Sequence, residues 1–212
     1  MQPPQNVADA YNKTAANYAL KYGDELKGKH LDRLLLQAFA MSNRHKGRMI
    51  DLGCGPGQTT RYLADCTVTD LLGTDLSEEM VKVAGGTHED ISFEVADMLA
   101  LPYSDGAFGS AVAFYAIVHF DDEQLALAFK EIHRILEPGG ELLFSFHIGE
   151  GTVHMDTFLE QPVNLDFFFH DLDTIERQVK EAGFDIVDLI QRRPYPNAEH
   201  PTQRAYVWVR KA

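Results

Sequence analysis

The sequence lacks several features that mark particular classes of protein. Only two of its 212 residues are cysteines, Cys54 and Cys66, and they form no Cys-x-x-Cys pair. Two cysteines cannot make a disulfide framework, and their spacing matches no zinc motif. No apolar run is long enough to span a membrane, and the start "MQPPQNVADAYNK" lacks the basic and apolar regions of a secretory signal. We therefore expect a cytoplasmic protein without a membrane partner.

Basic residues are scarce as well. The chain has 19 Lys and Arg against 32 Asp and Glu, which gives a formal net charge of −13. Nucleic-acid affinity rests largely on Lys and Arg residues that neutralise phosphates, so this balance argues against DNA or RNA as a partner. We expect a small-molecule partner, neutral or cationic, and a protein that is a monomer or a homodimer.

From about residue 48 onward, short apolar runs alternate with helical patterns. This alternation is typical of βαβ units and a parallel sheet. Two of the helices are predicted to begin at capping boxes, one formed by Asp121 with Gln124 and the other by Asp173 with Glu176. The predicted strands are 48–53, 71–76, 91–97, 109–117, 140–147, 184–192 and 205–211.

Two segments depart from this alternation. Residues 1–45 carry two helical patterns and no strand, so we expect an N-terminal helical lid before a main domain of residues 46–212. Residues 147–170 contain four acids, three histidines and a Phe triplet, but no Lys or Arg. We expect this second segment to be an insertion over the sheet edge.

The stretch "MIDLGCGPGQTT" (49–60) places Gly53, Gly55 and Gly57 at alternate positions, directly after an apolar run and an acid, at the end of a predicted strand. Glycines let the backbone turn sharply and approach a ligand closely. The helix that follows points its N-terminal N–H groups at the same place, which suits a phosphate or a carboxylate equally well. The dinucleotide fingerprint Gly-x-Gly-x-x-Gly is not matched, so a pyrophosphate fits poorly.

The stretch "IDLGCGPGQ" resembles the first motif of the class I S-adenosylmethionine-dependent methyltransferases of the small-molecule type. Four further stretches are similar to the same family in order and spacing: "LLGTDLSEEMV" with Asp75, "VADMLALPY" with Asp97, "AFYAIVHF" and "EIHRILEPGGELLFSF". The resemblance covers residues 48–146. The Asn/Asp-Pro-Pro-Tyr pattern of enzymes that methylate nucleic-acid amino groups is absent, and Phe108-Gly109 stands where many relatives have Phe-Asp.

The resemblance implies an α/β fold with a Rossmann-like, doubly wound sheet under an N-terminal helical cover. Its seven mostly parallel strands would lie in the order 3-2-1-4-5-7-6, with strand 7 antiparallel. The implied cofactor is S-adenosyl-L-methionine, the implied product is S-adenosyl-L-homocysteine, and the methyl group would pass by direct displacement to an O, N, C or S nucleophile. The implied cofactor-binding residues are Asp51, Gly53, Cys54, Gly55, Gly57, Asp75, Leu76, Asp97, Met98, Phe114, Tyr11 and Tyr18.

The reactive end of the site is predicted to lie at "AFYAIVHF". His119, whose imidazole titrates near neutral pH, is a candidate general base, and Tyr115 is a second catalytic candidate. A structural histidine is an equal alternative for His119, and Asp51 has an alternative role as a cap of the glycine turn. The residues predicted to bind the acceptor are His147, His154, Phe168 and His170. The three histidines with Asp156 match no standard metal site, so we predict no metal.

Two other functions fit parts of the pattern. A domain that binds the cofactor but serves as a regulatory or scaffold module would carry the same glycine loop and acids. A nicotinamide-dependent oxidoreductase would share the doubly wound sheet, although the glycine spacing argues against it. The acid-rich insertion favours an amine or a neutral acceptor over a phosphorylated one.

Overall fold

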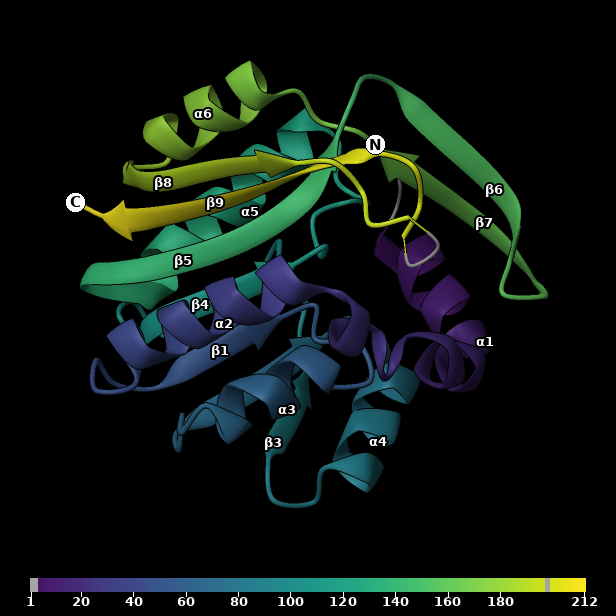
Figure 1. Cartoon of the computed structure of the whole chain (residues 1–212), viewed down its shortest axis with the longest axis horizontal. Coiled ribbons are helices and arrows are strands. Elements are labelled where there is room, and N and C mark those ends of the chain that lie inside the picture. Colours follow the sequence, from purple (N-terminus) through teal and green to yellow (C-terminus); the bar gives the residue numbers. More distant parts are fainter. Residues whose placement is uncertain (1–3, 197–198) are drawn as a thin grey trace.

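A seven-stranded sheet forms the centre of the molecule (Figure 1), in a computed structural model that describes residues 4–196 and 199–212. Its strands lie in the order β3-β2-β1-β4-β5-β9-β8. Neighbouring strands among the first five are parallel, and β9 runs antiparallel to both of its neighbours. The strands are β1 (Met49–Leu52), β2 (Leu71–Asp75), β3 (Ser92–Val95), β4 (Phe108–Phe114), β5 (Leu136–Ile148), β8 (Phe184–Arg192) and β9 (Gln203–Lys211). The predicted order is confirmed, because β8 and β9 are the sixth and seventh predicted strands.

Helices cover both faces of this sheet. They are α1 (Pro4–Tyr22), α2 (His30–Asn43), α3 (Gln58–Asp65), α4 (Glu78–Thr87), α5 (Asp122–Ile135) and α6 (Leu172–Glu181), with one 3₁₀ turn, η1 (Glu25–Gly28). Successive strand residues point to opposite sides of a sheet. Met49 of β1 therefore packs in a cluster with Phe39 of α2, whereas Ile50 packs with Phe129 of α5 on the other face.

Two of the helices begin at aspartate caps. Asp121 accepts backbone N–H groups of the first turn of α5, and the Gln124 side chain accepts the N–H of Asp121, so the predicted capping box is confirmed. The box predicted at Asp173 is wrong. Helix α6 begins after Asp171, whose side chain accepts the N–H of Thr174 at 2.9 Å. Asp173 instead lies within the first turn, where its charge suits the helix dipole.

The predicted N-terminal lid contains α1, η1 and α2, which lie in different places. Helix α2 buries Leu36 and Phe39 in the core and is part of one layer of the sandwich. Helix α1 packs against α4 and against the β6–β7 hairpin described below. Only α1 therefore has the position of a cover, and the domain boundary at residue 45 stays a prediction. No helix in the described ranges combines the length and the apolar character needed to cross a membrane.

The predicted insertion forms a two-stranded antiparallel hairpin that projects past the sheet towards α1 (Figure 1). Its strands, which the sequence analysis did not predict, are β6 (Thr152–Phe158) and β7 (Gln161–Phe168). The turn between them contains only Leu159 and Glu160, with φ values of 48° and 65°, as a tight type I′ turn requires. Asn17 of α1 donates to the carbonyl of Leu159 at 3.0 Å, which fastens the tip of the hairpin to the helix.

Candidate active site

A cavity of about 900 Å³ lies where β1, β2 and β4 end, and α1 and the hairpin form part of its wall. Ligands of doubly wound sheets bind at these carboxyl ends. The predicted site residues that line it are Tyr11, Tyr18, Asp51, Gly53, Cys54, Gly55, Asp75, Leu76, Asp97, Met98, Phe114, Tyr115, His119, His147 and Phe168. Gly57, His154 and His170 are not among its lining residues.

The loop after β1 follows a path that glycine allows. Gly53 and Gly55 have φ values of 67° and 54°, in the left-handed region that other residues rarely adopt. A Cβ on Gly53 would lie 2.5 Å from the Cβ of Ala116, just after β4. A Cβ on Gly57 would instead meet the ring of His88 at 2.9 Å, away from the cavity. Gly53 thus allows the close approach of Ala116, and Gly57 makes room for its own packing neighbours.

Asp75, at the end of β2, holds this loop in place. Its Oδ2 accepts the N–H of Gly55 at 2.9 Å, and its Oδ1 accepts the N–H of Ser77 at 2.9 Å. Burial raises the pKa of the Asp75 carboxyl, and the backbone hydrogen bonds oppose the rise. A carboxylate offers about four acceptor sites, so Asp75 can still accept hydrogen bonds from ligand hydroxyl groups.

Asp51 is the most deeply buried acid beside the loop, with 1% of its surface exposed. Its Oδ2 accepts the hydroxyl of Thr60 in α3 at 2.7 Å. Burial raises the pKa of Asp51 to about 7, although the hydrogen bond from Thr60 opposes the rise. A positively charged ligand group beside Asp51 would favour the ionised form of this carboxyl group.

The loops after β2 and β3 give the cavity an apolar part beside a carboxylate. Leu76 and Met98 both line it, as does Asp97. The Oδ1 of Asp97 accepts the N–H of Leu99 at 2.9 Å, which fixes the side chain at the start of its loop. An apolar slot next to a hydrogen-bond acceptor suits a flat ring that carries an amino group.

Tyr11 of α1 and His119, from the loop after β4, form a hydrogen-bonded pair in the cavity. The Nδ1 of His119 lies 2.7 Å from the carbonyl oxygen of Asp166, which can only accept, so Nδ1 carries the proton. The Nε2 then accepts the hydroxyl of Tyr11 at 2.8 Å. Burial lowers the pKa of His119 to about 4, so the imidazole is neutral at pH 7. The pair therefore brings a neutral acceptor nitrogen and a phenol to the cavity.

Tyr115 lines the cavity, but its hydroxyl belongs to a buried network. The hydroxyl donates to Asp32 at 3.2 Å and lies 3.0 Å from the hydroxyl of Tyr206. Asp32, fully buried in α2, also accepts from Tyr206 at 2.6 Å and from Arg192 at 2.9 Å. The φ of Tyr115 is 54°, an unusual value for a side chain of this size. Its geometry is that of a residue that shapes the cavity, and its catalytic role stays a prediction.

Several polar residues of the cavity are not identified by the sequence analysis. Lys29, only 7% exposed, lies 2.6 Å from Glu25 and 4.6 Å from the ring centre of Tyr115. Arg204, in β9, lies 3.3 Å from Glu199. These side chains come from distant segments that no motif connects. No sequence signal marks them, and the fold alone brings them together.

The three histidines of the predicted insertion lie in three different places. His147 lines the main cavity, and burial, together with the charge of Arg204, lowers its pKa to about 3. His154 lies outside, where its ring nitrogens are 2.7 and 3.1 Å from two carboxylates of the same hairpin. His170 lies in a second cavity. Among the residues that the structure describes, no three His, Cys, Asp or Glu side chains are grouped to hold a metal ion.

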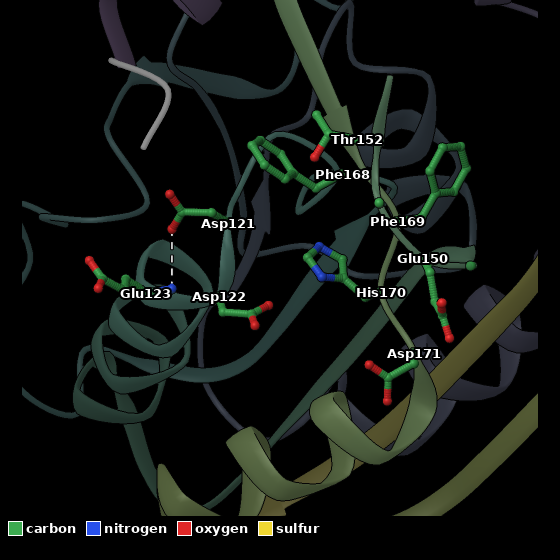
Figure 2. Close-up of a pocket in the computed structure, with 11 residues that line it drawn as sticks. Asp121, Asp122, Glu123, Glu150, Thr152, Phe168, Phe169, His170 and Asp171 are labelled. Atoms are coloured by element: carbon green, nitrogen blue, oxygen red, sulfur yellow. Dashed lines mark hydrogen bonds between the residues drawn. The ribbon is translucent and has the colours of Figure 1, made fainter. Parts of the chain in front are cut away.

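Figure 2 shows this second cavity, of about 550 Å³, beside the start of α5 and the start of α6. His170 lies there among the side chains of Asp121, Asp122, Glu123, Glu150 and Asp171. Asp121 caps α5 (dashed line in Figure 2) and Asp171 caps α6. Asp122 and Glu123 lie in the first turn of α5, where negative charge favours the helix. Most of these acids are therefore explained by the helix ends. Phe168 lines both cavities.

Comparisons with known proteins agree with this geometry. The sequence profile of a family described as "Methyltransferase domain" matches residues 49–140. The chain is 32% identical over 164 residues to a malonyl-[acyl-carrier protein] O-methyltransferase from Erwinia billingiae, a match that covers 76% of this chain and 61% of that protein. The chain thus spans between 29% and 61% of the length of curated relatives that it matches.

Two solved structures share the fold. Magnesium protoporphyrin IX methyltransferase from Synechocystis, with bound S-adenosylmethionine, has a TM-score of 0.76 at 16% identity, covering 100% of this chain and 98% of that one. The [4+2]-cyclase SpnF has a TM-score of 0.65 at 21% identity, covering 84% of this chain and 81% of that one.

The strand order, with its antiparallel β9, and the glycine loop at the end of β1 define a Rossmann-like fold of the methyltransferase type. The chain belongs to the class I S-adenosylmethionine-dependent methyltransferase family.

Proposed function

We propose that this protein transfers a methyl group from S-adenosylmethionine to a small-molecule acceptor. The observation that carries the proposal is a cavity that joins the glycine loop, Asp75 and Asp97 to the Tyr11–His119 pair. A cofactor held by the glycine loop, Asp75 and Asp97 would have its reactive end near Tyr11 and His119. The net charge of −13 supports a small molecule over a nucleic acid as the acceptor.

The residues present fit this cofactor. Gly53 and Gly55 line the cavity without side chains, so a ligand can approach the backbone of this loop closely. Asp75 has acceptor capacity for the two ribose hydroxyl groups, and Asp97 beside Met98 suits an adenine ring with its amino group. The buried carboxyl of Asp51 suits the ammonium group of the methionine part.

The chain supplies chiefly position and shape to the reaction. When bound, the cofactor supplies a methyl group on a positively charged sulfur. Holding the acceptor in line with this methyl group is worth up to about 7–11 kcal/mol of the barrier in ideal cases. The positive charge disperses during the transfer, so a neutral His119 is adequate beside it. The attacking group donates a hydrogen bond to the hydroxyl oxygen of Tyr11, and its proton passes through this hydroxyl to Nε2 of His119, while the carbonyl of Asp166 orients the imidazole.

A cofactor-binding module without turnover is the second candidate function. It has support because the residues that would bind the cofactor do not by themselves require turnover, and the same fold serves other chemistry, as in SpnF, whose name describes a cyclase. A nicotinamide-dependent oxidoreductase has less support, since the glycine spacing departs from the dinucleotide fingerprint.

Release of S-adenosylhomocysteine separates these candidates. The protein is incubated with S-adenosylmethionine and a panel of small phenols, amines, thiols and carboxylic acids, and the product is measured by mass spectrometry. The proposal predicts that S-adenosylhomocysteine forms faster with an acceptor than in a control that lacks one. It also predicts that His119→Gln lowers this rate by about 10²-fold or more. Cofactor binding without product across the panel would favour the module, and no binding would contradict both.

A further inference from the structure

Resting on the proposed function, we propose that the methyl acceptor is a flat, uncharged aromatic molecule with a phenolic hydroxyl, bound between the β6–β7 hairpin and α1. The hairpin alternates apolar and polar side chains. Val153 pairs with Phe167 and Met155 pairs with Leu165, so these four side chains share one face. Val153, Met155 and Phe167 line the main cavity. Val153 nevertheless stays 48% exposed, so protein atoms do not cover this apolar face completely.

The charged side chains of the hairpin point the other way. His154 pairs with Asp166 on the opposite face, where the two side chains are hydrogen-bonded at 2.7 Å. The side chain of Asp156 is 92% exposed. The acid-rich composition of this segment therefore describes its outer surface. It does not describe the surface that an acceptor would meet, so it gives no support to a cationic acceptor.

The part of the wall that α1 contributes beside the hairpin is apolar too. The first turns of α1 contribute Pro4, Val7 and Ala8. In the described part of the chain, no cavity-lining residue from the hairpin or from these turns carries a charge. Of the cations that line the cavity, Lys29 is paired with Glu25 and Arg204 with Glu199, and Lys21 lies in the last turn of α1, at the other end of that helix from Pro4, Val7 and Ala8. A charged acceptor body under the hairpin would lose its hydration without gaining a partner.

Aromatic rings define the shape of this space. The ring centres of Phe158 and Phe167 are 5.9 Å apart, and that of Phe167 lies 4.6 Å from that of His119. Phe158 also lies 6.1 Å from Tyr11. Rings at these separations favour another ring in edge or offset contact. An aromatic acceptor among them would hold its substituent beside the Tyr11–His119 pair.

The nature of that pair favours a phenolic hydroxyl. The lone pair on Nε2 of His119 accepts a hydrogen bond from an O–H group, here that of Tyr11. A neutral, buried imidazole is a weak base, so the acceptor proton must be more acidic than that of an aliphatic alcohol. In the transfer, the phenolic oxygen forms the new bond to the methyl carbon while the carbon–sulfur bond breaks and leaves its electron pair on sulfur. The phenolic proton passes to the hydroxyl oxygen of Tyr11 as the Tyr11 proton passes to Nε2, and the imidazolium then releases a proton to solvent, which gives an aryl methyl ether, S-adenosylhomocysteine and a proton.

Two probes that differ by one charge test this inference. Protein saturated with S-adenosylhomocysteine is titrated with 2-naphthol and with 6-hydroxynaphthalene-2-sulfonate. We expect 2-naphthol to bind at least about tenfold more tightly. With S-adenosylmethionine in place of the product, 2-naphthol should yield its methyl ether, detected by mass spectrometry. Equal or tighter binding of the sulfonate, or of 2-(aminomethyl)naphthalene, would overturn the inference.

Variants of the two hairpin faces provide the matched control. Phe167→Ala should weaken 2-naphthol binding about tenfold, because a large apolar contact is lost. Asp156→Ala, on the outer face of the same hairpin, should leave it within about twofold. Val153→Lys should make the protein prefer the sulfonate to 2-naphthol. Because Val153 is 48% exposed, this substitution leaves the buried core unchanged. Unchanged 2-naphthol binding in Phe167→Ala would refute the assignment. Failure of the wild-type protein to bind S-adenosylhomocysteine would instead refute the proposed function.

Discussion

Acid should destabilise the wild-type protein more than a variant in which His119 is replaced by glutamine. The ordinary pKa of histidine is 6.5, and burial lowers the pKa of His119 to about 4 in the folded protein. Between these values the unfolded chain binds a proton that the folded chain does not. The stability that neutral His119 provides is therefore complete above pH 6.5 and is lost as the pH falls towards 4. At 1.36 kcal/mol per pKa unit, this loss reaches about 2 kcal/mol between pH 8 and pH 5.

Urea unfolding of the two proteins at pH 8, 6.5 and 5 measures this effect. Glutamine does not titrate, and the other groups contribute equally to both proteins. The free energy of unfolding of the wild type, minus that of His119→Gln, should fall by about 2 kcal/mol from pH 8 to pH 5. At a urea slope of about 1–3 kcal/mol/M, the two midpoints shift relative to each other by about 1 M. A difference that stays constant with pH would refute the neutral, buried state on which the mechanism depends.

Three further substitutions test separate parts of the structure. Gly53→Ala places a Cβ 2.5 Å from that of Ala116. We expect this variant to lower the free energy of unfolding by about 1–3 kcal/mol and to abolish cofactor binding in calorimetry. Normal cofactor binding would contradict the described loop. Tyr115→Phe removes a hydroxyl from the buried network. Urea unfolding should show a free energy of unfolding lower by about 1–3 kcal/mol, and turnover should be unchanged. A stable but inactive variant would support the predicted catalytic role of Tyr115. Asp171→Ala removes the cap of α6 and should lower the free energy of unfolding by about 1 kcal/mol in thermal or urea unfolding. Asp173→Ala should change the free energy of unfolding by less than about 0.5 kcal/mol. Equal losses in the two variants would refute Asp171 as the cap.

The parts of the site nearest to the parallel strands could be predicted from the sequence. Strand ends are marked locally, by an apolar run followed by a glycine or an acid, and the carboxyl ends of parallel strands meet at one edge. Gly55 and Asp75 are therefore identified from short stretches, and the structure joins them by a hydrogen bond from the Gly55 N–H to the Asp75 carboxylate. Tyr11 and His119 are each identified, but their contact across 108 positions is a product of the fold.

The hairpin shows why the rest could not be predicted. Its alternation of Val153 and Met155 with His154 is a strand signal, but composition alone describes the segment only as acidic. Which face points inward depends on the strand register, and a shift of one residue would exchange the two faces. The network of Asp32 and Arg192 joins residues 160 positions apart. Neither carries any local mark of its role, because both are ordinary surface residue types buried by their pairing.

Calorimetric titration of the purified protein with S-adenosylhomocysteine tests the central claim most directly. NAD serves as the control ligand and Asp75→Ala as the control variant, since Asp75 both orders the loop and offers acceptor atoms to the ribose. The account predicts binding in the micromolar range, weakened at least about tenfold in the variant, with no heat from NAD. Absence of binding by protein shown to be free of copurified ligand, or equal binding by Asp75→Ala, would contradict it.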